Sequence, residues 1–594
     1  MKKLITTFII LTAALCLSSC GKKAPPSTEV TALVMDGEHY TIEVSSVSLK
    51  PGSDASFLIE TDSGYEVTET DYTGEYRISP VHGLTKLELV DVRYPTRVRL
   101  TLSNHTRTVT YIANGGDSAT GEGKSVVRSY DISYHTRPNV SIGTDIFTWE
   151  GYTLTCWNTE PDGTGDRVGL GSRVTVSDSL TLYAQWAKWT EPELFTYEIS
   201  DNSARITGYS GGETTLVIPE ALGGYPVTVI GESAFKDCGA ESVILPKSIV
   251  SVEENAFAGA KLRVLSFFDN IEYITDGCFA GCDNLSTLRI SAIEDPYGYS
   301  FRRESVLADK LDLLITTMGE KRLVFYGGCS MWYNLIGPDA QKAFDGSFTV
   351  INMGLNGVTS SIFQMELMAN FITENDIIIH TPEISSSQQL LLTTGLSKYD
   401  DKLWCAMEYN YDLVSLLDMR RFDGGVLESL RLYLDKKKPG GRYTDIYHDS
   451  KGYEYFDETG SIPYYRDKSA EKLVDTVLLD PDYLSDLSRL EEEYGLFTER
   501  GARIYVSYAS IDIESVPEEQ QGNIALMGKL YTEKFSCMNG VAVISEIYDF
   551  IYHDADFYDT VYHLLTIPAQ NCTRVWIRDI KSQLSRDGLW VDGK

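Results

Sequence analysis

A chain of 594 residues is long enough for several domains rather than one. Its 52 Lys and Arg against 85 Asp and Glu give a formal net charge of −33, which repels phosphate backbones and argues against a nucleic-acid partner. The ten cysteines include no pair at the two-residue spacing of zinc ligands, and their scatter is not typical of a disulfide scaffold, so we expect neither a metal nor another cofactor.

Residues 1–20 have the features of an export signal. Two lysines follow the initial methionine, and residues 4–17 form an apolar run that is short for a membrane span. Residues 17–20 read LSSC and precede a glycine, a pattern that resembles the lipobox of bacterial lipoproteins. The resemblance implies cleavage before Cys20 and a diacylglycerol on its sulfur, so that acyl chains hold the protein on the extracytoplasmic face of the cell membrane. An ordinary secretory signal and a single anchor helix are the alternatives.

Residues 28–107 alternate apolar and polar positions in short runs such as TIEVSSVSL, KLELVDV and TRVRLTL, separated by Gly, Pro and Asp. A period of two with frequent turns predicts a small β-domain with a sandwich-like arrangement. No cluster of residues in this segment indicates chemistry.

Residues 108–187 open with TVTYIANGG, continue with GYTLTCWNTEPDGTGDRVGLG and close with LTLYAQW. The most informative positions are Tyr111, Asn114, Gly115, Gly116, Gly151, Tyr152, Trp157, Leu182, Tyr183, Ala184 and Trp186. The Asn-Gly step predicts a hairpin turn, and the aromatic residues provide a core for a module too small to bury much else. The segment resembles the Listeria–Bacteroides repeat, a β-grasp-like module of internalin-type surface proteins. This resemblance implies a spacer or adhesion module and does not imply catalysis.

Residues 193–293 repeat with a fixed period. Ala-Phe or Cys-Phe pairs place Phe235, Phe257 and Phe279 at intervals of 22 residues, and apolar runs such as LVIP, VILP and VLSF recur between them. A period in this range predicts a solenoid of about four units, each burying its apolar edge against its neighbours. The pattern resembles the BspA-type leucine-rich repeat. We expect the three phenylalanines to stack in its core and its exposed strand face to be available to a ligand.

Beyond residue 300, apolar strand-like runs alternate with amphipathic helical segments. The runs are 323–326, 348–354, 376–383, 502–509 and 540–546. Their alternation with helices predicts a three-layer α/β domain over residues 300–594, with a mostly parallel, flavodoxin-like sheet. Sites in such sheets lie at the carboxyl ends of the strands, which is where the motifs GGCS and NMGLNG fall. An insert rich in Tyr and Asp, from about 395 to 480, is predicted to cover that edge as a lid or rim.

The GGCS turn, the Asn-x-Gly after the next strand and a late Asp…His element together resemble an SGNH hydrolase-type domain. The similar branch acts outside the cell on acyl groups of polysaccharides or teichoic acids. The resemblance implies that Cys329 or Ser330 is the nucleophile, with His563 as general base and Asp559 as its orienting acid. It also implies that Gly354 donates its N–H to a developing oxyanion.

The chain departs from the SGNH pattern at three points. A cysteine stands at the aligned nucleophile position, Asp559 and His563 are four residues apart instead of three, and the asparagine near the third strand is missing. A thiolate beside an imidazole is a strong nucleophile, but a site that has lost its activity could also keep a small buried cysteine. Asn334 and Asn356 are alternative oxyanion donors, and His380 is either a base or a hydrogen-bonded core residue.

Two functions follow from these patterns. One is a surface-anchored acyl-esterase or acyltransferase acting on cell-envelope or extracellular glycans. The other is a non-enzymatic adhesion or scaffold protein whose hydrolase-like domain is inactive. The expected partners are the membrane, through the lipid anchor, and a cell-envelope polysaccharide or a host surface protein. An enzyme requires one of the two nucleophile candidates within hydrogen-bond reach of His563.

Overall fold

The computed structural model describes residues 29–594 with gaps. The longer gaps are 132–138, 293–305, 356–360, 383–403, 405–410, 423–429, 432–458, 462–475 and 591–594, and shorter ones fall at 43, 63–64, 82–83, 105, 120, 122, 177–178, 276, 345, 460 and 559. Cys20, Asn356, Asp559 and most of the predicted lid therefore lie outside the described residues. The described chain is rich in β structure, and its longer helices all follow residue 305. Among these helices none is both long and apolar enough to cross a membrane.

In the first compact unit, up to Arg107 together with Ser129–His135, the regular elements of the described residues are all strands. Its strands are β1 (Val30–Val34), β2 (Tyr40–Ile42), β3 (Ser46–Leu49), β4 (Ser53–Thr61), β5 (Tyr65–Thr70), β6 (Tyr76–Val81), β7 (Leu84–Val92), β8 (Thr96–Val98) and β9 (Leu100–Asn104). They pair in the orders β3-β1-β8, β2-β4-β7-β6 and β5-β9. Alternate residues of β4, including Phe57 and Ile59, are buried against Leu87 and Leu89 of β7, as the period of two predicts.

The second unit begins with the module that resembles the Listeria–Bacteroides repeat. Its strands are β10 (Thr106–Ile112), β11 (Asp117–Ser118), β12 (Ser125–Asp131), β13 (Asn139–Ser141), β14 (Phe147–Thr148), β15 (Tyr152–Asn158), β16 (Arg167–Val168), β17 (Arg173–Thr175) and β18 (Ser179–Lys188). The main sheet has the order β12-β10-β18-β15-β16. Tyr111 and Trp157 meet edge to face in the core with centroids 4.8 Å apart, and the Trp157 indole donates to Gly143 O at 2.8 Å. Asn114 and Gly115 both have positive φ and form a turn, but the next strand, β11, pairs with β14 and not with β10, so the Asn-Gly step is not the predicted hairpin turn.

The solenoid follows in the same unit. It contains η1 (Pro192–Leu194), β19 (Phe195–Ser200), β20 (Ser203–Tyr209), β21 (Thr215–Val217), β22 (Ala221–Leu222), β23 (Tyr225–Ile230), β24 (Ser242–Ile244), β25 (Ser251–Val252), β26 (Val264–Phe268), β27 (Tyr273–Ile274) and β28 (Thr287–Ser291). β21-β24-β26-β28 form one parallel sheet, and β20-β23-β25-β27 run in parallel in the other. The ring of Phe257 stacks on Phe235 at 5.1 Å and on Phe279 at 5.6 Å, which confirms the register of 22 residues.

Each of the five apolar runs beyond residue 300 contains a strand, and these strands pair in parallel in the order β30-β29-β31-β32-β34. They are β29 (Arg322–Gly327), β30 (Thr349–Asn352), β31 (Asp376–Thr381), β32 (Arg503–Val506) and β34 (Val541–Val543), with a separate parallel pair of β33 (Ile511–Asp512) and β35 (Ile551–Tyr552). At one end of the sheet Arg322 and Asp376 form a fully buried ion pair that joins β29 to β31.

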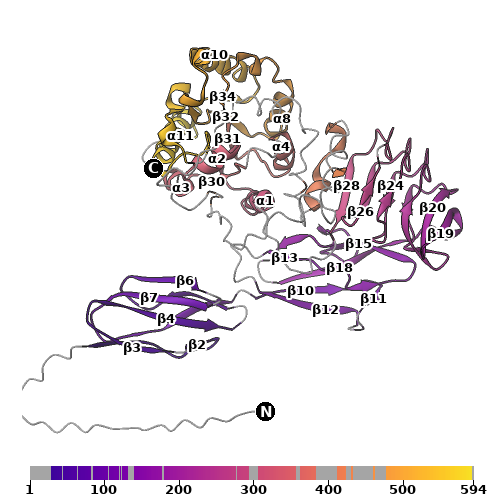
Figure 1. The fold of residues 1–594 in the computed structure, drawn as a ribbon, viewed down its shortest axis with the longest axis horizontal. Coiled ribbons are helices and arrows are strands. Elements are labelled where there is room, and N and C mark those ends of the chain that lie inside the picture. The colour runs from indigo at the N-terminus through magenta and orange to yellow at the C-terminus, as the bar shows by residue number, and fades with distance from the viewer. Residues whose placement is uncertain are drawn as a thin grey trace, which may run out of the picture. The chain divides into compact units, whose positions relative to one another are not determined.

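Helices pack around this sheet in two groups. The helical elements are α1 (Val306–Thr316), α2 (Cys329–Asn334), α3 (Gly337–Phe344), α4 (Ser361–Ala369), η3 (Tyr411–Leu416), η4 (Met419–Phe422), η5 (Pro481–Leu484), α8 (Ser488–Thr498), η6 (Ile513–Ser515), α9 (Glu518–Gln521), α10 (Ile524–Phe535), η7 (Ile547–Phe550), η8 (Asp554–Asp556) and α11 (Thr566–Arg586). α11 contacts α2 and α3, whereas α4 contacts α8. Figure 1 shows the sheet between these two groups.

Candidate functional site

The turn after β29 brings the chain from the sheet directly into α2. Gly327 has to be a glycine because a Cβ there would lie 2.7 Å from Thr381 Oγ1 on the neighbouring strand. Gly328 is the extended residue before the helix, and Cys329 is the first helical residue. The predicted strand–turn–helix is therefore present, and it places Cys329 and Ser330 at the carboxyl edge of the sheet.

Both nucleophile candidates are buried, since Cys329 is 8% exposed and Ser330 is 1% exposed. Cys329 packs in a cluster with Trp332 and Tyr333 of its own helix. The ring of Tyr333 stacks on the imidazole of His563, with centroids 3.8 Å apart and planes 16° from parallel. The structure thus brings His563 to the helix that carries Cys329 and Ser330, with the Tyr333 ring in contact with both the imidazole and the cysteine cluster.

The third predicted residue, Gly354, lies against this helix. A Cβ on Gly354 would lie 2.5 Å from the backbone nitrogen of Trp332, so the close approach of the two segments requires glycine. The Gly354 N–H donates to Asn352 Oδ1 at 2.9 Å, and its carbonyl accepts from the buried ammonium of Lys310 at 2.5 Å. An oxyanion would have to displace Asn352 to receive the Gly354 N–H.

Asn334, an alternative oxyanion donor, instead joins α2 to the segment that contains His563. Its amide nitrogen donates to Tyr562 O at 2.9 Å and to Ser510 Oγ at 3.0 Å, and its oxygen accepts from Leu564 N at 2.8 Å. This residue fixes the backbone on both sides of His563 relative to α2. A polar side chain whose donors and acceptor are all engaged in structure serves positioning rather than oxyanion binding.

His380 is a hydrogen-bonded core residue. It lies on β31 with 2% of its surface exposed, and its Nδ1 is 2.5 Å from the hydroxyl of Tyr494. The ring also packs against Tyr326 with centroids 4.7 Å apart. Burial lowers the pKa of His380 to about 3, so the imidazole is neutral at physiological pH. Of the two roles that the sequence left open for His380, these contacts favour the structural one.

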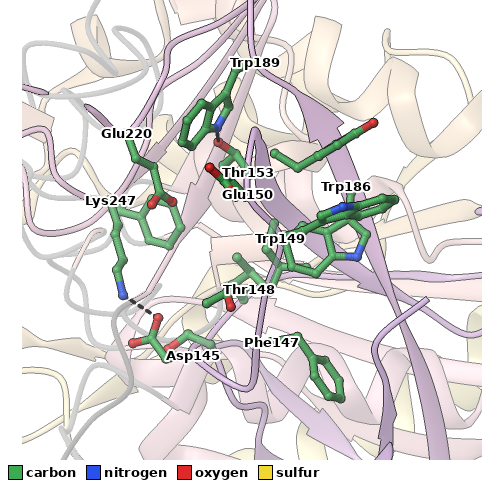
Figure 2. Close-up of a pocket in the computed structure, with 15 residues that line it drawn as sticks. Asp145, Phe147, Thr148, Trp149, Glu150, Thr153, Trp186, Trp189, Glu220 and Lys247 are labelled. Atoms are coloured by element: carbon green, nitrogen blue, oxygen red, sulfur yellow. Dashed lines mark hydrogen bonds and ion pairs between the residues drawn. The ribbon is translucent and has the colours of Figure 1, made fainter. Parts of the chain in front are cut away.

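A second candidate site lies where the repeat module meets the solenoid, and no motif predicted it. A hollow of about 330 Å³ is lined on the module side by Trp186 of β18 and by tryptophans that follow β14 and β18, and on the solenoid side by polar residues that follow β21 and β24. In Figure 2 Trp149 and Trp186 lie on one side of it, Glu220 and Lys247 on the other, and Trp189 at one end. The available signal was the density of tryptophan in residues 149–189, of which the sequence pattern assigned Trp157 and Trp186 to the module core.

Side-chain charges at this cleft are mixed. Lys247 forms an ion pair with Asp145 at 2.5 Å, which connects the solenoid to the module (Figure 2). Glu220 lines the cleft on the solenoid side, and its pKa is raised, chiefly by desolvation and further by Asp145, against the opposing effect of Lys247. No group of His, Cys, Asp and Glu suited to a metal ion occurs here or elsewhere among the described residues.

Comparisons with known proteins identify the two repeat segments. Residues 216–323 match the BspA type leucine rich repeat region in six copies, where the phenylalanine spacing predicted about four units. Residues 108–185 match the Listeria-Bacteroides repeat domain. The chain therefore carries two kinds of repeat, both anticipated from the sequence. No curated protein matches it.

Three solved structures are similar to parts of the chain. A leucine-rich repeat protein from Bacteroides capillosus is 24% identical over 17% of this chain and 96% of that one, with a TM-score of 0.14. The leucine rich repeat protein of T. pallidum is 17% identical over 17% of this chain and 71% of that one, with a TM-score of 0.13. A leucine rich cell surface protein from Faecalibacterium prausnitzii is 18% identical over 32% of this chain and 44% of that one, with a TM-score of 0.15. The assignment of the segments rests on the family matches.

Proposed function

We propose that the chain is a surface-anchored binding protein with a role in adhesion or scaffolding. The observation that carries the proposal is that the repeat module and the solenoid are joined through their backbones, with an aromatic cleft between them. Thr190, just after β18, donates its N–H to Val217 O and accepts at Oγ1 from Val217 N, each at 3.0 Å. Ala292 donates its N–H to Leu170 O at 2.9 Å. A preformed cleft of this kind is typical of binding sites.

Anchoring through Cys20 supports the same function. The LSSC motif at residues 17–20 resembles a lipobox, and a lipid-anchored chain would present both repeat segments outside the cell. The strongly negative charge of the chain favours solubility and argues against nucleic acid as the partner.

Adherence of cells that display the full chain tests this proposal. Bacteria expressing the wild-type chain should adhere to an epithelial layer, or co-aggregate with a second bacterium, more strongly than cells without it. Cys20→Ala should abolish labelling by radioactive palmitate, release the protein and return adherence to background. Equal adherence with and without the chain would refute a role in adhesion, and unchanged palmitate labelling of the variant would refute the anchor.

An SGNH-like acyl-esterase or acyltransferase is the second candidate, favoured by the contact of His563 with the helix that begins at Cys329. If the domain is active, His563→Ala should lower ester hydrolysis by about 10³-fold or more. Cys329→Ser should keep or raise activity, Cys329→Ala should remove it, and Ser330→Ala should matter little. Absence of hydrolysis of p-nitrophenyl acetate and of acetylated polysaccharide by the wild-type chain would leave the domain as a binding or structural part.

A further inference from the structure

Tryptophan side chains form one wall of the cleft between module and solenoid. Trp149, Trp186 and Trp189 are each half-buried, so part of each indole is accessible. Trp149 stacks on Tyr152 with centroids 4.1 Å apart and meets Trp186 edge to face at 5.8 Å. The planes of Trp149 and Trp186 are 85° apart and Trp189 lies at one end of the cleft, so the indoles offer apolar faces and edges against which a partly apolar ring can pack.

This wall is held in place before any ligand arrives. The indole N–H of Trp186 donates to Ala113 O at 2.8 Å, and that of Trp189 donates to Thr153 Oγ1 at 2.9 Å. Thr190, the next residue, is bonded through its backbone and its hydroxyl to Val217 of the solenoid. Aromatic side chains fixed in this way lose little conformational entropy on binding, which raises affinity.

Polar groups line both sides of the cleft. Glu220 and Lys247 come from the solenoid and Asp145 and Glu150 from the module, which gives three carboxylates and one ammonium group. Carboxylates accept strong hydrogen bonds from hydroxyl groups. The excess of negative charge also disfavours an anionic ligand, because like charges in the same cleft repel one another.

The size of the cleft favours a ligand of several rings over a small cation. The hollow of about 330 Å³ adjoins a second one of about 500 Å³, and both are lined by Thr144, Asp145, Glu220, Lys247 and Phe268. Together they have the dimensions of a site for a ligand of several rings. A small quaternary ammonium group, which aromatic cages also bind, would leave most of this space empty.

We infer that this cleft is a carbohydrate-binding site for a short stretch of neutral glycan, stacked on the tryptophans and hydrogen-bonded by the carboxylates. The apolar C–H face of a pyranose ring fits an indole, its hydroxyl groups fit carboxylates, and an oligosaccharide fits the combined volume of the two hollows. The inference deepens the proposed function, on which it rests, by naming the class of partner.

Titration of the purified full chain with trisaccharides, followed by calorimetry and tryptophan fluorescence, tests the inference. The probes are maltotriose, cellotriose, tri-N-acetylchitotriose and the acidic trigalacturonate. At least one neutral trisaccharide should bind with a Kd below about 1 mM and change the fluorescence, and trigalacturonate should bind at least about tenfold more weakly. Trp149→Ala should weaken the neutral ligand by about tenfold or more.

Two further variants separate loss of binding from loss of folding. Glu220→Gln keeps the shape of the side chain and should weaken the same ligand several-fold without changing the circular dichroism. Glu272→Gln is the matched control: it is an exposed glutamate of the solenoid that does not line the cleft, and it should bind as wild type. Equal affinity of Trp149→Ala, Glu220→Gln and wild type would overturn the inference.

Two other outcomes also contradict a neutral-glycan site. One is binding of choline with no binding of any neutral trisaccharide below about 1 mM, and the other is preference for trigalacturonate. Adherence of cells displaying the chain distinguishes this failure from failure of the proposed function. If no trisaccharide binds but the chain still confers adherence, only the glycan site is wrong. If a trisaccharide binds and adherence is absent, the glycan site is supported and the adhesion role is refuted.

Discussion

His380 illustrates how burial alone decides the state of a side chain in this protein. The imidazole has a pKa of about 3 in the folded chain because desolvation disfavours its charged form. In the unfolded chain its pKa is about 6.5. Between these two values the unfolded state binds a proton that the native state does not bind. The contribution of His380 to the free energy of unfolding is therefore greatest above about pH 6.5, and it decreases as the pH is lowered toward 3.

This difference predicts a specific change in acid stability. His380→Gln removes the titration, so wild type should lose about 1.4 kcal/mol per pH unit relative to the variant between about pH 6 and pH 4. Urea unfolding at several pH values, followed by near-ultraviolet circular dichroism, measures the difference. His553→Gln is the control: His553 is exposed and its pKa is raised by Glu514, so this variant should keep the acid dependence that His380 causes. If the free energy of unfolding falls with pH in the same way for His380→Gln and wild type, the lowered pKa of His380 is wrong.

At the candidate nucleophile turn, sequence reasoning predicted position but not environment. The apolar run before Gly327 was enough to place Cys329 and Ser330 at the carboxyl edge of a parallel sheet. The pattern could not show that the Gly354 N–H is engaged by Asn352, because that bond depends on the approach of two segments far apart in the chain. The role of Asp559 stays a prediction, since that residue lies outside the described part of the chain.

Among the elements, the phenylalanine stack of the solenoid has the most direct energetic consequence. Phe257 is fully buried between Phe235 and the half-buried Phe279. Phe257→Ala removes both ring contacts and leaves a cavity, so we expect it to lower the free energy of unfolding by roughly 3–5 kcal/mol. Thermal unfolding of the full chain should show the shift in the transition of the solenoid.

The control for the stack is Tyr273→Ala, in the same solenoid, because the Tyr273 side chain is 53% exposed. Tyr273→Ala should change the midpoint of thermal unfolding little. If the Phe257→Ala and Tyr273→Ala variants unfold at the same temperature, the stack contributes nothing to the stability of the solenoid. The repeat interval was predictable from sequence because a solenoid repeats one residue type at one position, so a local pattern reports a long-range contact.

The contact between Gly354 and α2 gives a second prediction at the scale of elements. Gly354→Ala places a methyl group 2.5 Å from Trp332 N, so α2 has to move and the variant should lose about 1–3 kcal/mol. Gly495→Ala is the matched control, since Gly495 lies within α8 with open space around it and should gain up to about 1 kcal/mol. Equal melting temperatures of the two variants would contradict the tight packing described for α2.

At the scale of the second unit, the segment 411–422 joins parts that the sequence presents as independent. Asp412 accepts from Arg167 Nη1 and from Gly169 N, each at 2.6 Å, and Met419 N donates to Ser286 O at 2.9 Å. The module and the solenoid are thus bonded both to each other and to η3 and η4. Single-sequence patterns predict each repeat but not such connections, which explains why the cleft between module and solenoid was missed.

We propose that this chain binds through the cleft of its repeat segments rather than through its C-terminal domain. The most direct test is the saturable binding of fluorescently labelled full chain to intact cells, compared for wild type, Trp149→Ala and His563→Ala. We predict that Trp149→Ala weakens binding by about tenfold or more while His563→Ala binds as wild type. Loss of binding in His563→Ala with full binding in Trp149→Ala would contradict the account and place the function at the edge of the parallel sheet.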